Sequence, residues 1–428
     1  METENSAPRR ITADDKETLI GIKVIITMNN SKKIKFATFF PQCFDVHITK
    51  DVGMIPYILY REYLYDSSII SYQNDTYSKL ISETPGLKME FLKKYRHSSI
   101  DSIFKVLHVE VTPGTIIDSF IYFLKFAKKI DILQVYHFTS ESLIVSFIFR
   151  LLNKNSKIYL KLDMNPEIIN QYKQNVNDLL FKNIFQFVLL KFISFDIISV
   201  ETKVLNKFLK AEHPLFRHFK INIHYIPSGV DINQENEDAK DIFDKKENII
   251  LHVGRLSFEK GTDIAMQAFI GVVNQFPEWK LVLIGNIDNS FEKYFAQIIR
   301  QYPDEAKKIE RVGFIKSAQE LKTWYLRGKI LLVPSHSESF GIVTIEAGIN
   351  GCVVISSDIT SFNEITNNGS HGYLCPVNDL DCFIKTLEYA ISNEDDIKRR
   401  AQIFRNYILI YYNWAKICGK LNNIFLGK

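Results

Sequence analysis

The sequence predicts an α/β protein made of two doubly wound, Rossmann-like domains that face a cleft. Short apolar runs alternate with helical patterns along most of the 428 residues, which indicates parallel sheets covered by helices. The length is sufficient for two domains of ordinary size, and 46% hydrophobic residues are enough for two cores. Polar residues directly follow several of the apolar runs, where open α/β sheets bind their ligands.

Composition excludes several classes of protein. The five cysteines are scattered and form no CxxC pair, so neither a zinc site nor a disulfide framework is predicted, and we expect a reducing, cytoplasmic environment. Residues 1–15 lack the apolar core of a secretory signal, and no apolar run is long enough for a transmembrane helix. The net charge of +4 fits an anionic membrane surface or acceptor, and equally an ordinary solvated surface. No nucleic-acid partner is predicted.

The expected strands fall into two groups. In the first half they span residues 33–39, 68–72, 132–136, 157–162 and 196–200, and an additional strand at 22–27 has no assigned role. In the second half they span residues 223–226, 248–253, 280–284, 309–314, 330–333 and 353–356. We therefore divide the chain into a tail with the additional strand (1–30), a first domain (31–205), a second domain (206–411) and a final helix (412–428).

The most informative stretch carries Glu338 and Glu346 just after a short apolar run. The pattern predicts a strand, a loop and a helix that begins near Phe340, with Ser337 or Ser339 as its cap. If one helix carried both glutamates, they would lie roughly 12 Å apart, about the distance from ribose to sugar in a nucleotide-sugar. An ordinary strand–helix unit with two surface glutamates is equally typical of this pattern.

The first turn of that helix, at Phe340, Gly341 and Ile342, is a candidate phosphate site. Unpaired backbone N–H groups and the positive end of the helix dipole favour an anion there, and a glycine lets the anion approach the backbone. Arg255 and Lys260 follow another strand and lie just before a predicted helix, where both can reach a phosphate-sized ligand. Either cation taken alone is more often a solvated or salt-bridged surface residue.

Further candidates follow other predicted strands. Backbone groups near Gly313 and Phe314 could bind the edge of a base, although a simple turn glycine fits equally well. Gly53 is expected in a loop that leads into a helix, the usual place for a phosphate or acceptor site. His137 follows a strand and fits an active or a structural role equally; the other nine histidines are interpreted as structural or surface residues. The segment 361–374 is interpreted as a loop that closes the same site.

Four motifs occur in the order found in retaining glycosyltransferases of family 4: IPSGVD, HVGRLSFEKG, PSHSESFGIVTIEAG, and SFNEI with NGSHGYLCP. The chain resembles this family specifically over about residues 200–428. Over 33–200 the resemblance is looser, and KDVGMIPYIL, KIDILQVYHF and KIYLKLDMN look like the acceptor domain of bacterial members. The resemblance implies the GT-B fold, with an acceptor domain, a nucleotide-sugar donor domain and a last helix that crosses back to the first domain at Trp414.

The resemblance also implies a role for each candidate residue. Arg255 and Lys260 would hold the donor diphosphate, and Glu346 would bind the ribose hydroxyls. Glu338 would meet the transferred sugar, and His137 resembles the histidine near the reacting sugar. The remaining donor-binding candidates are Phe340, Gly341, Ile342, Gly313, Phe314 and Gly53.

The implied reaction transfers a hexose with retention at the anomeric carbon and needs no metal or other cofactor. Cationic side chains and a helix N-terminus would stabilise the negative charge on the departing diphosphate. The pair Asp379 and Asp381 is interpreted as a turn and helix cap. The alternative function is a GT-B subunit that stabilises a catalytic partner without turning over donor itself.

The acceptor is expected to be a glycan, a lipid-linked molecule or a protein, in the synthesis of a cell-surface polysaccharide or glycoconjugate. The stretch 182–195 is rich in aromatic residues and carries lysines, which fits an interfacial helix and also a core helix. Many relatives act on membrane-held acceptors. We therefore predict that the first domain attaches peripherally to the inner face of the cell membrane.

Overall fold

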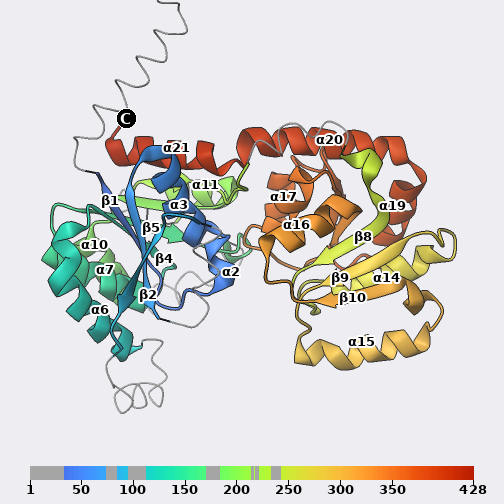
Figure 1. Cartoon of the computed structure of the whole chain (residues 1–428), viewed down its shortest axis with the longest axis horizontal. Helices are drawn as coiled ribbons and strands as arrows, with labels where there is room; N and C mark the ends of the chain where they lie inside the picture. Colours follow the sequence, from blue (N-terminus) through green and yellow to red (C-terminus); the bar gives the residue numbers. More distant parts are fainter. Residues whose placement is uncertain are drawn as a thin grey trace, which may run out of the picture.

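The computed structural model describes residues 33–73, 84–94, 112–169, 184–213, 216, 221–232 and 242–428. In this part of the chain, two α/β halves lie side by side and are joined by two crossing segments (Figure 1). Each half contains one parallel sheet with helices on both faces. The two-domain, doubly wound prediction is therefore confirmed, whereas the additional strand expected at 22–27 lies outside the described residues.

The first sheet has seven parallel strands in the order β3-β2-β1-β4-β5-β6-β7. They are β1 (Lys35–Phe39), β2 (Asp66–Tyr72), β3 (Lys88–Leu92), β4 (Ile132–Tyr136), β5 (Lys157–Leu162), β6 (Ile197–Val200) and β7 (Ile223–Tyr225). The sequence pattern missed β3, because this partly exposed edge strand mixes charged and apolar residues. Ile223 of β7 pairs with Ile198 of β6, so the first sheet extends beyond the domain boundary placed at residue 205.

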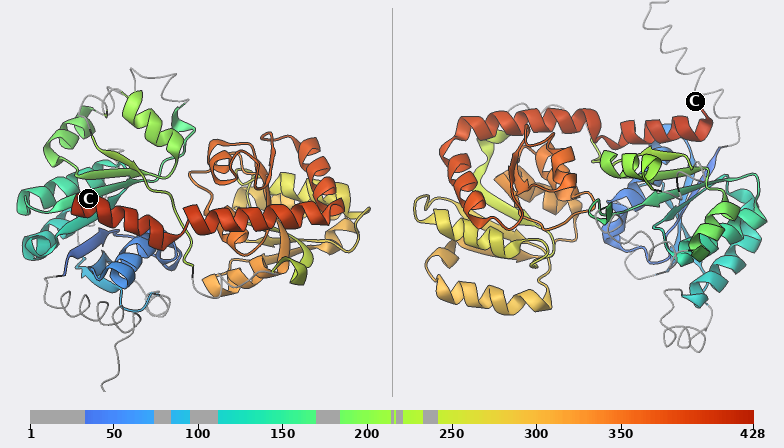
Figure 2. Two further views of the ribbon diagram at one scale, coloured as in Figure 1. Left: turned by 90° about the horizontal axis from the view of Figure 1, so that it is seen from above. Right: turned by 180° about the vertical axis from the view of Figure 1, so that it is seen from behind.

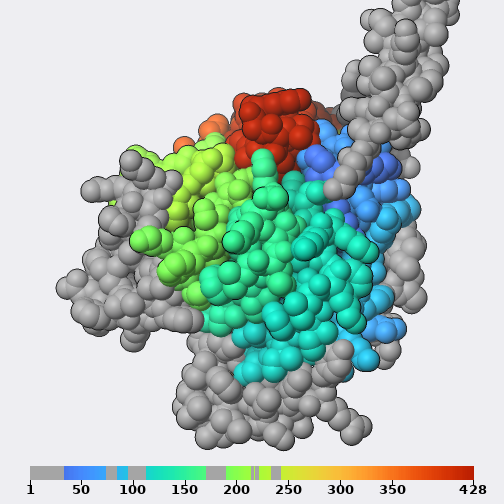
Figure 3. All heavy atoms as spheres, turned by 90° about the vertical axis from the view of Figure 1, so that its left-hand side faces the viewer, coloured from blue at the N-terminus to red at the C-terminus, as the bar shows by residue number. Residues whose placement is uncertain are grey.

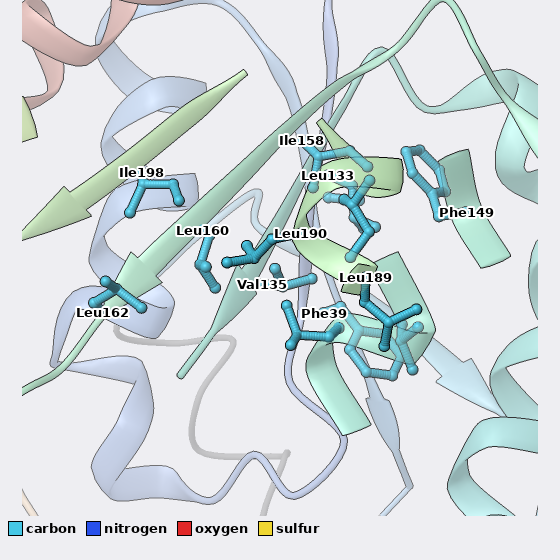
Figure 4. Close-up of a cluster of buried hydrophobic side chains, with 14 of the residues drawn as sticks. Phe39, Leu133, Val135, Phe149, Ile158, Leu160, Leu162, Leu189, Leu190 and Ile198 are labelled. Atoms are coloured by element: carbon cyan, nitrogen blue, oxygen red, sulfur yellow. The ribbon is translucent and has the colours of Figure 1, made fainter. Parts of the chain in front are cut away.

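Two layers of helices cover the first sheet. One face packs against α6 (Pro113–Phe126), α7 (Ser140–Leu152), α10 (Ile184–Ile193) and α11 (Lys203–Ala211). The other face packs against α2 (Asp45–Ile48), α3 (Asp51–Tyr63) and α21 (Trp414–Leu426). Side chains of a strand alternate between these faces. Figure 4 shows the first layer, where Leu189 and Leu190 of α10 meet Phe39, Val135 and Leu160 of the strands.

The second sheet has six parallel strands in the order β10-β9-β8-β11-β12-β13. They are β8 (Glu247–Val253), β9 (Lys280–Ile284), β10 (Ile309–Gly313), β11 (Gly328–Val333), β12 (Val353–Ser357) and β13 (Tyr373–Cys375). One face packs against α14 (Thr262–Val273), α15 (Asn289–Gln301) and α19 (Leu380–Ser392). The other face packs against α16 (Ala318–Arg327), α17 (Ile342–Ile349), α18 (Thr360–Ile365) and α20 (Glu394–Tyr411). The short strand β13 was not predicted.

The chain crosses between the halves at two neighbouring points. The backbone N–H of Val230 donates to the carbonyl of Tyr412 at 2.8 Å, and the N–H of Trp414 donates to the carbonyl of Val230 at 3.1 Å. Beyond this junction, α21 packs on α3, and the ring of Phe425 lies 5.8 Å from that of Phe36. Figure 2 shows from two further sides that α20 and α21 run along one side of both halves.

Candidate functional site

A cavity of about 540 Å³ lies between the two halves. Its first wall comes from α2 and α3 and includes Lys50 and Tyr57. Its second wall comes from α16, α17 and the segment after β10, and includes Phe314, Ile342 and Glu346. Three of the predicted donor-binding residues therefore line one cavity, at the carboxyl edge of the second sheet, where ligands bind in open α/β folds.

Glu346 is one of the predicted site residues that line the cavity. It lies one turn into α17 and is half-buried, and Tyr325 of α16 donates a hydrogen bond to its Oε2 at 3.0 Å. Burial raises the pKa of this carboxyl group above its usual value, although the Tyr325 hydrogen bond and the charge of Lys50 oppose the shift. Lys50 and Tyr325 were not among the sequence candidates. The pattern could not find them, because neither adjoins the glutamate motif in the chain.

The start of α17 differs from the prediction. The helix begins at Ile342 rather than near Phe340, and its N-cap is Gly341, which has a φ of 86° and uses no side-chain cap. A Cβ atom on Gly341 would lie 2.5 Å from the ring of Phe362, so this position needs glycine for both backbone conformation and space. Phe340 lies outside the helix with its side chain buried, and its ring is 5.8 Å from that of Tyr412.

Glu338 lies in the loop before α17, so the helical estimate of its distance from Glu346 does not apply. Its Oε1 is 2.8 Å from the Nζ of Lys260 and accepts a hydrogen bond from Ser335 at 3.1 Å. Lys260 belongs to the loop between β8 and α14, residues 254–261, which we call the cation loop. The structure therefore pairs two predicted site residues from loops that are far apart in the sequence.

The cation loop also carries Arg255. Its guanidinium group pairs with Glu259 on the surface, and both side chains are about half exposed. The backbone N–H of His336 donates a hydrogen bond to the carbonyl of Glu259 at 2.9 Å, which connects the cation loop to the loop before α17. Arg255 thus lies on the same loop as Lys260. Neither of these cations, nor Glu338, is among the described residues that line the cavity.

Gly313 and Phe314 lie where β10 ends. Gly313 has a φ of 86°, and its carbonyl accepts a hydrogen bond from Gly285 at 2.8 Å. Phe314 is 46% exposed and lines the cavity. Phe314 therefore lies at the cavity, whereas Gly313 is not among the described residues that line it. Binding of a base here stays a prediction.

Two candidates from the first half lie elsewhere. Gly53 is inside the first turn of α3 rather than in a loop, and a Cβ there would lie 2.2 Å from the carbonyl oxygen of Ile48, so close packing of α2 on α3 explains the glycine. His137 follows β4 with a φ of 61°, is exposed, and donates its backbone N–H to the carbonyl of Lys161 at 3.0 Å. Neither residue is among the described residues that line the cavity.

The segment 361–374 does not form the expected loop over the cavity. It contains α18 and the start of β13, and Glu364 accepts a hydrogen bond from the backbone N–H of Lys203, at the start of α11, at 2.7 Å. It lines a separate cavity of about 490 Å³ that also includes Tyr407. Phe362 of this segment packs in the core of the second half, and Glu364 contacts the first half, a long-range contact that a local pattern does not reveal.

The expected helix cap at Asp379 is present. Its side chain accepts a hydrogen bond from the N–H of Cys382 at 2.9 Å, at the start of α19. Among the described residues, no group of three or more histidine, cysteine, aspartate or glutamate side chains is arranged to hold a metal ion. The same part of the chain has no helix long and apolar enough to cross a membrane.

Two domains, each with one parallel sheet, and a cavity between them are the features of the GT-B fold. Solved glycosyltransferase structures have the same fold. Sucrose-phosphate synthase from Thermosynechococcus elongatus superimposes with a TM-score of 0.67 at 16% identity, over 92% of this chain and 99% of that one. The HepE protein of Anabaena in complex with UDP superimposes with a TM-score of 0.64 at 13% identity, over 93% and 100%. At these identities the likeness shows the fold alone.

The second half is the part with a family match. Residues 233–407 match the family described as glycosyl transferases group 1. A phosphatidyl-myo-inositol mannosyltransferase of Mycobacterium tuberculosis is 25% identical over 205 residues, which is 47% of this chain and 53% of that protein. The lipopolysaccharide core mannosyltransferase LpcC of Rhizobium leguminosarum is 27% identical over 134 residues, 31% and 38% respectively. The chain spans about half or less of the length of the curated relatives that it matches.

Proposed function

We propose that this protein is a retaining glycosyltransferase of family 4 that transfers a hexose from a nucleoside-diphosphate sugar to an acceptor. The observation that carries the proposal is the cavity between the halves, which has Glu346 in one wall. The ion pair of Lys260 and Glu338 supports it, although these two residues do not line the cavity. The mannosyltransferase relatives and the neighbours bound to UDP support a nucleotide-sugar donor.

In this proposal the second half binds the donor. Glu346 accepts hydrogen bonds from the ribose hydroxyls, and the base lies near Gly313 and Phe314. Lys260 and Arg255 bind the diphosphate, together with the first turn of α17 after Phe340 and Gly341, where backbone N–H groups and the helix dipole favour an anion. The ammonium group of Lys260 has three N–H donors, so it can bind Glu338 and a phosphate oxygen at once.

Charge stabilisation on the leaving group supplies the catalysis. Negative charge develops on the diphosphate as its bond to the sugar breaks, and fixed cations and dipoles aimed at that charge stabilise the transition state most. Glu338 holds Lys260 and lies at the transferred sugar, and closure of the halves brings His137 and Gly53 toward the reacting groups. The reaction needs no metal in this scheme.

A direct test is a panel of nucleotide-sugars offered to the purified protein, with binding and donor hydrolysis as the two measurements. A transferase binds one donor and hydrolyses it slowly without acceptor. The alternative, a GT-B subunit that only stabilises a partner, is not favoured because all the candidate residues are present. Binding without any hydrolysis would support that alternative, and absence of binding to every donor would contradict both.

We further propose that the acceptor is held at a membrane and that the first half attaches to it peripherally. Leu189, Leu190 and Ile193 of α10 are buried in the first core, while Phe192 is 63% exposed beside Lys191. One side of this helix therefore packs in the core, and the exposed side with Phe192 is the one that we propose contacts lipid.

Two further helices of this layer also carry exposed apolar side chains. Leu124 of α6 and Leu151 of α7 are each 57% exposed, and α7 packs against both α6 and α10. Figure 3 shows this side of the first half, where the teal chain forms much of the surface. Apolar side chains near lysines are typical of a surface that binds anionic lipid.

Flotation with anionic liposomes at low and high salt tests the attachment. We expect co-flotation at low salt that weakens as salt screens the lysines. Phe192→Ser should reduce it, whereas Tyr389→Ser, at a residue 49% exposed in the second half, should not. A protein that stays wholly in the soluble fraction at low salt would indicate a soluble glycan or protein acceptor.

A further inference from the structure

A chain of hydrogen bonds lies beneath the cation loop. His252, near the end of β8, is 1% exposed, and its two ring nitrogens both have partners. Nδ1 is 2.9 Å from the carbonyl oxygen of Leu332 in the neighbouring strand β11, and Nε2 is 3.0 Å from the Oγ1 of Thr262 at the start of α14. The same hydroxyl oxygen accepts the backbone N–H of Ser257 at 3.0 Å. The chain therefore connects the centre of the sheet to the middle of the loop.

The donors in this chain can be assigned from chemistry. A carbonyl oxygen only accepts, so the proton is on Nδ1, and Nε2 must accept from the Thr262 hydroxyl. Burial lowers the pKa of His252 to about 4, which keeps the ring neutral above that pH. Every polar group of the chain is then satisfied, with one direction of donation from Ser257 through Thr262 and His252 to Leu332.

The loop above this chain depends on external support. Its ends are Gly254, with a φ of 147°, and Gly261, with a φ of 66°. A Cβ on Gly261 would lie 2.0 Å from the carbonyl oxygen of Pro334, so the loop is in close contact with the loop that leads to Glu338. Within the loop, the N–H of Gly261 donates to the carbonyl of Phe258 at 2.9 Å. Because glycine has wide backbone freedom at both ends, contacts from outside the loop also contribute to its conformation. Ser257 receives such a contact from Thr262.

We propose that His252 and Thr262 are positioning residues that hold the cation loop in the conformation in which it binds a donor diphosphate. The inference rests on the proposed function of the loop. A pair that only stabilised the core would affect the free energy of unfolding and leave ligand selectivity unchanged. A positioning pair affects the diphosphate contacts and leaves the base and ribose contacts near Phe314 and Glu346 as they are.

The experiment compares Thr262→Val, which removes the hydroxyl at nearly constant shape, with Thr262→Ser, which keeps it. The probes are UDP, GDP and ADP by calorimetry, and uridine, guanosine and adenosine by ligand-observed NMR titration. The comparison uses the diphosphate and the nucleoside that share the base bound by the unsubstituted protein. Thr262→Val should weaken binding of this diphosphate about tenfold, the size expected for one lost buried hydrogen-bond partner. Its affinity for the nucleoside should stay within about twofold, and Thr262→Ser should resemble the unsubstituted protein for both probes.

A second pair of variants covers the case in which Thr262→Val does not fold. His252→Gln keeps a donor and an acceptor at this position, and His252→Leu keeps neither, so the leucine variant should lose more diphosphate affinity. Equal losses for diphosphate and nucleoside, or a lower melting temperature with unchanged binding, would overturn the positioning role alone. Absence of binding of all three diphosphates to the unsubstituted protein would overturn the proposed function as well.

Discussion

The two halves use the carboxyl edges of their sheets in different ways. In the first half, Lys161 near the end of β5 is fully buried, 2.9 Å from Glu201 and 3.3 Å from Asp51. Burial lowers the pKa of Lys161, but the charges of Glu201 and Asp51 more than offset this, so the pKa lies above its usual value. Ser228, in the segment that leads to the second half, also donates to Glu201 at 2.5 Å. The buried charge of Lys161 at this edge is therefore neutralised by carboxylates of the protein itself.

In the second half, the corresponding edge keeps its charges accessible. Lys260 and Glu338 form one pair, and their side chains are 23% and 15% exposed. Arg255 is on the surface of the same loop. A partly exposed pair can exchange a partner for a ligand at low cost, whereas a buried cluster cannot. The comparison teaches that one fold can neutralise buried charges at this edge in one half and keep a partly exposed ion pair there in the other, where we propose that the donor binds.

The largest expected effect comes from breaking the buried cluster. Lys161→Met should leave Glu201 buried without its cation and reduce the free energy of unfolding by about 3 to 5 kcal/mol. Lys260→Met is the matched control, because the pair that it removes is partly exposed and should contribute about 1 kcal/mol or less. Denaturant unfolding measures both. Equal destabilisation by the two variants would break the comparison.

The next effect concerns turnover. Lys260→Met should lower kcat/KM about 10²- to 10³-fold, the usual cost of removing one group that stabilises a developing anion. Lys307→Met provides the control, because Lys307 pairs with Asp304 on the surface and is 73% exposed. Steady-state kinetics with the donor found in the panel measures the difference. Similar losses in both variants would show that Lys260 has no special role.

Glu346→Gln should change donor binding and protein stability in opposite directions, and so separate the two roles of a charged group at this edge. Loss of the charge-assisted hydrogen bonds to ribose should weaken donor binding by about 1 to 3 kcal/mol, as calorimetry would show. The folded-state pKa of Glu346 is raised, so the ionised carboxylate costs stability, and this cost appears as pH rises from the unfolded pKa through the folded pKa.

The glutamine variant has no such cost. Its stability relative to the unsubstituted protein should therefore rise as the pH increases above the unfolded pKa of roughly 4.3 and level off above the folded-state pKa, and the gap should close below the unfolded pKa. Unfolding curves across this range measure the gap. A difference that is constant with pH would mean that the carboxyl group is not strained by burial.

The smallest expected effect is none at all. Excess EDTA should leave sugar transfer unchanged, because Lys260, Arg255 and the α17 dipole are proposed to take the place of a metal at the diphosphate. Activity assays with and without chelator, followed by added divalent ions, provide the measurement. Loss of turnover that a divalent ion restores would contradict this prediction.

Local sequence patterns predicted the strands better than the contacts between halves. Buried strands such as β4 and β5 consist of short apolar runs with clear ends, so their bounds agree with the prediction. The same pattern could not show that β7 completes the first sheet, because that depends on pairing with β6.

For the site residues too, local patterns predicted positions within one strand–helix unit better than contacts between distant segments. Glu346 and Ile342 could be predicted because they lie on one helix after a strand, and the structure places both at the cavity. The loop expected around Gly53 is instead the first turn of α3, because a glycine in a loop and one required by helix packing look alike in a sequence. The segment 361–374 was expected to close the same site, although Glu364 within it bonds to Lys203, which is 161 positions away and belongs to the other half.

The path of the chain has a consequence for synthesis on the ribosome. The core of the first half includes Trp414 and Phe425 of α21, which are translated only after the whole second half. The helix layer formed by α2 and α3 therefore stays incomplete while about half of the protein is being translated. A nascent chain that stops after α20 would carry all the strands of both sheets, yet it would expose the apolar surface of the half that was made first.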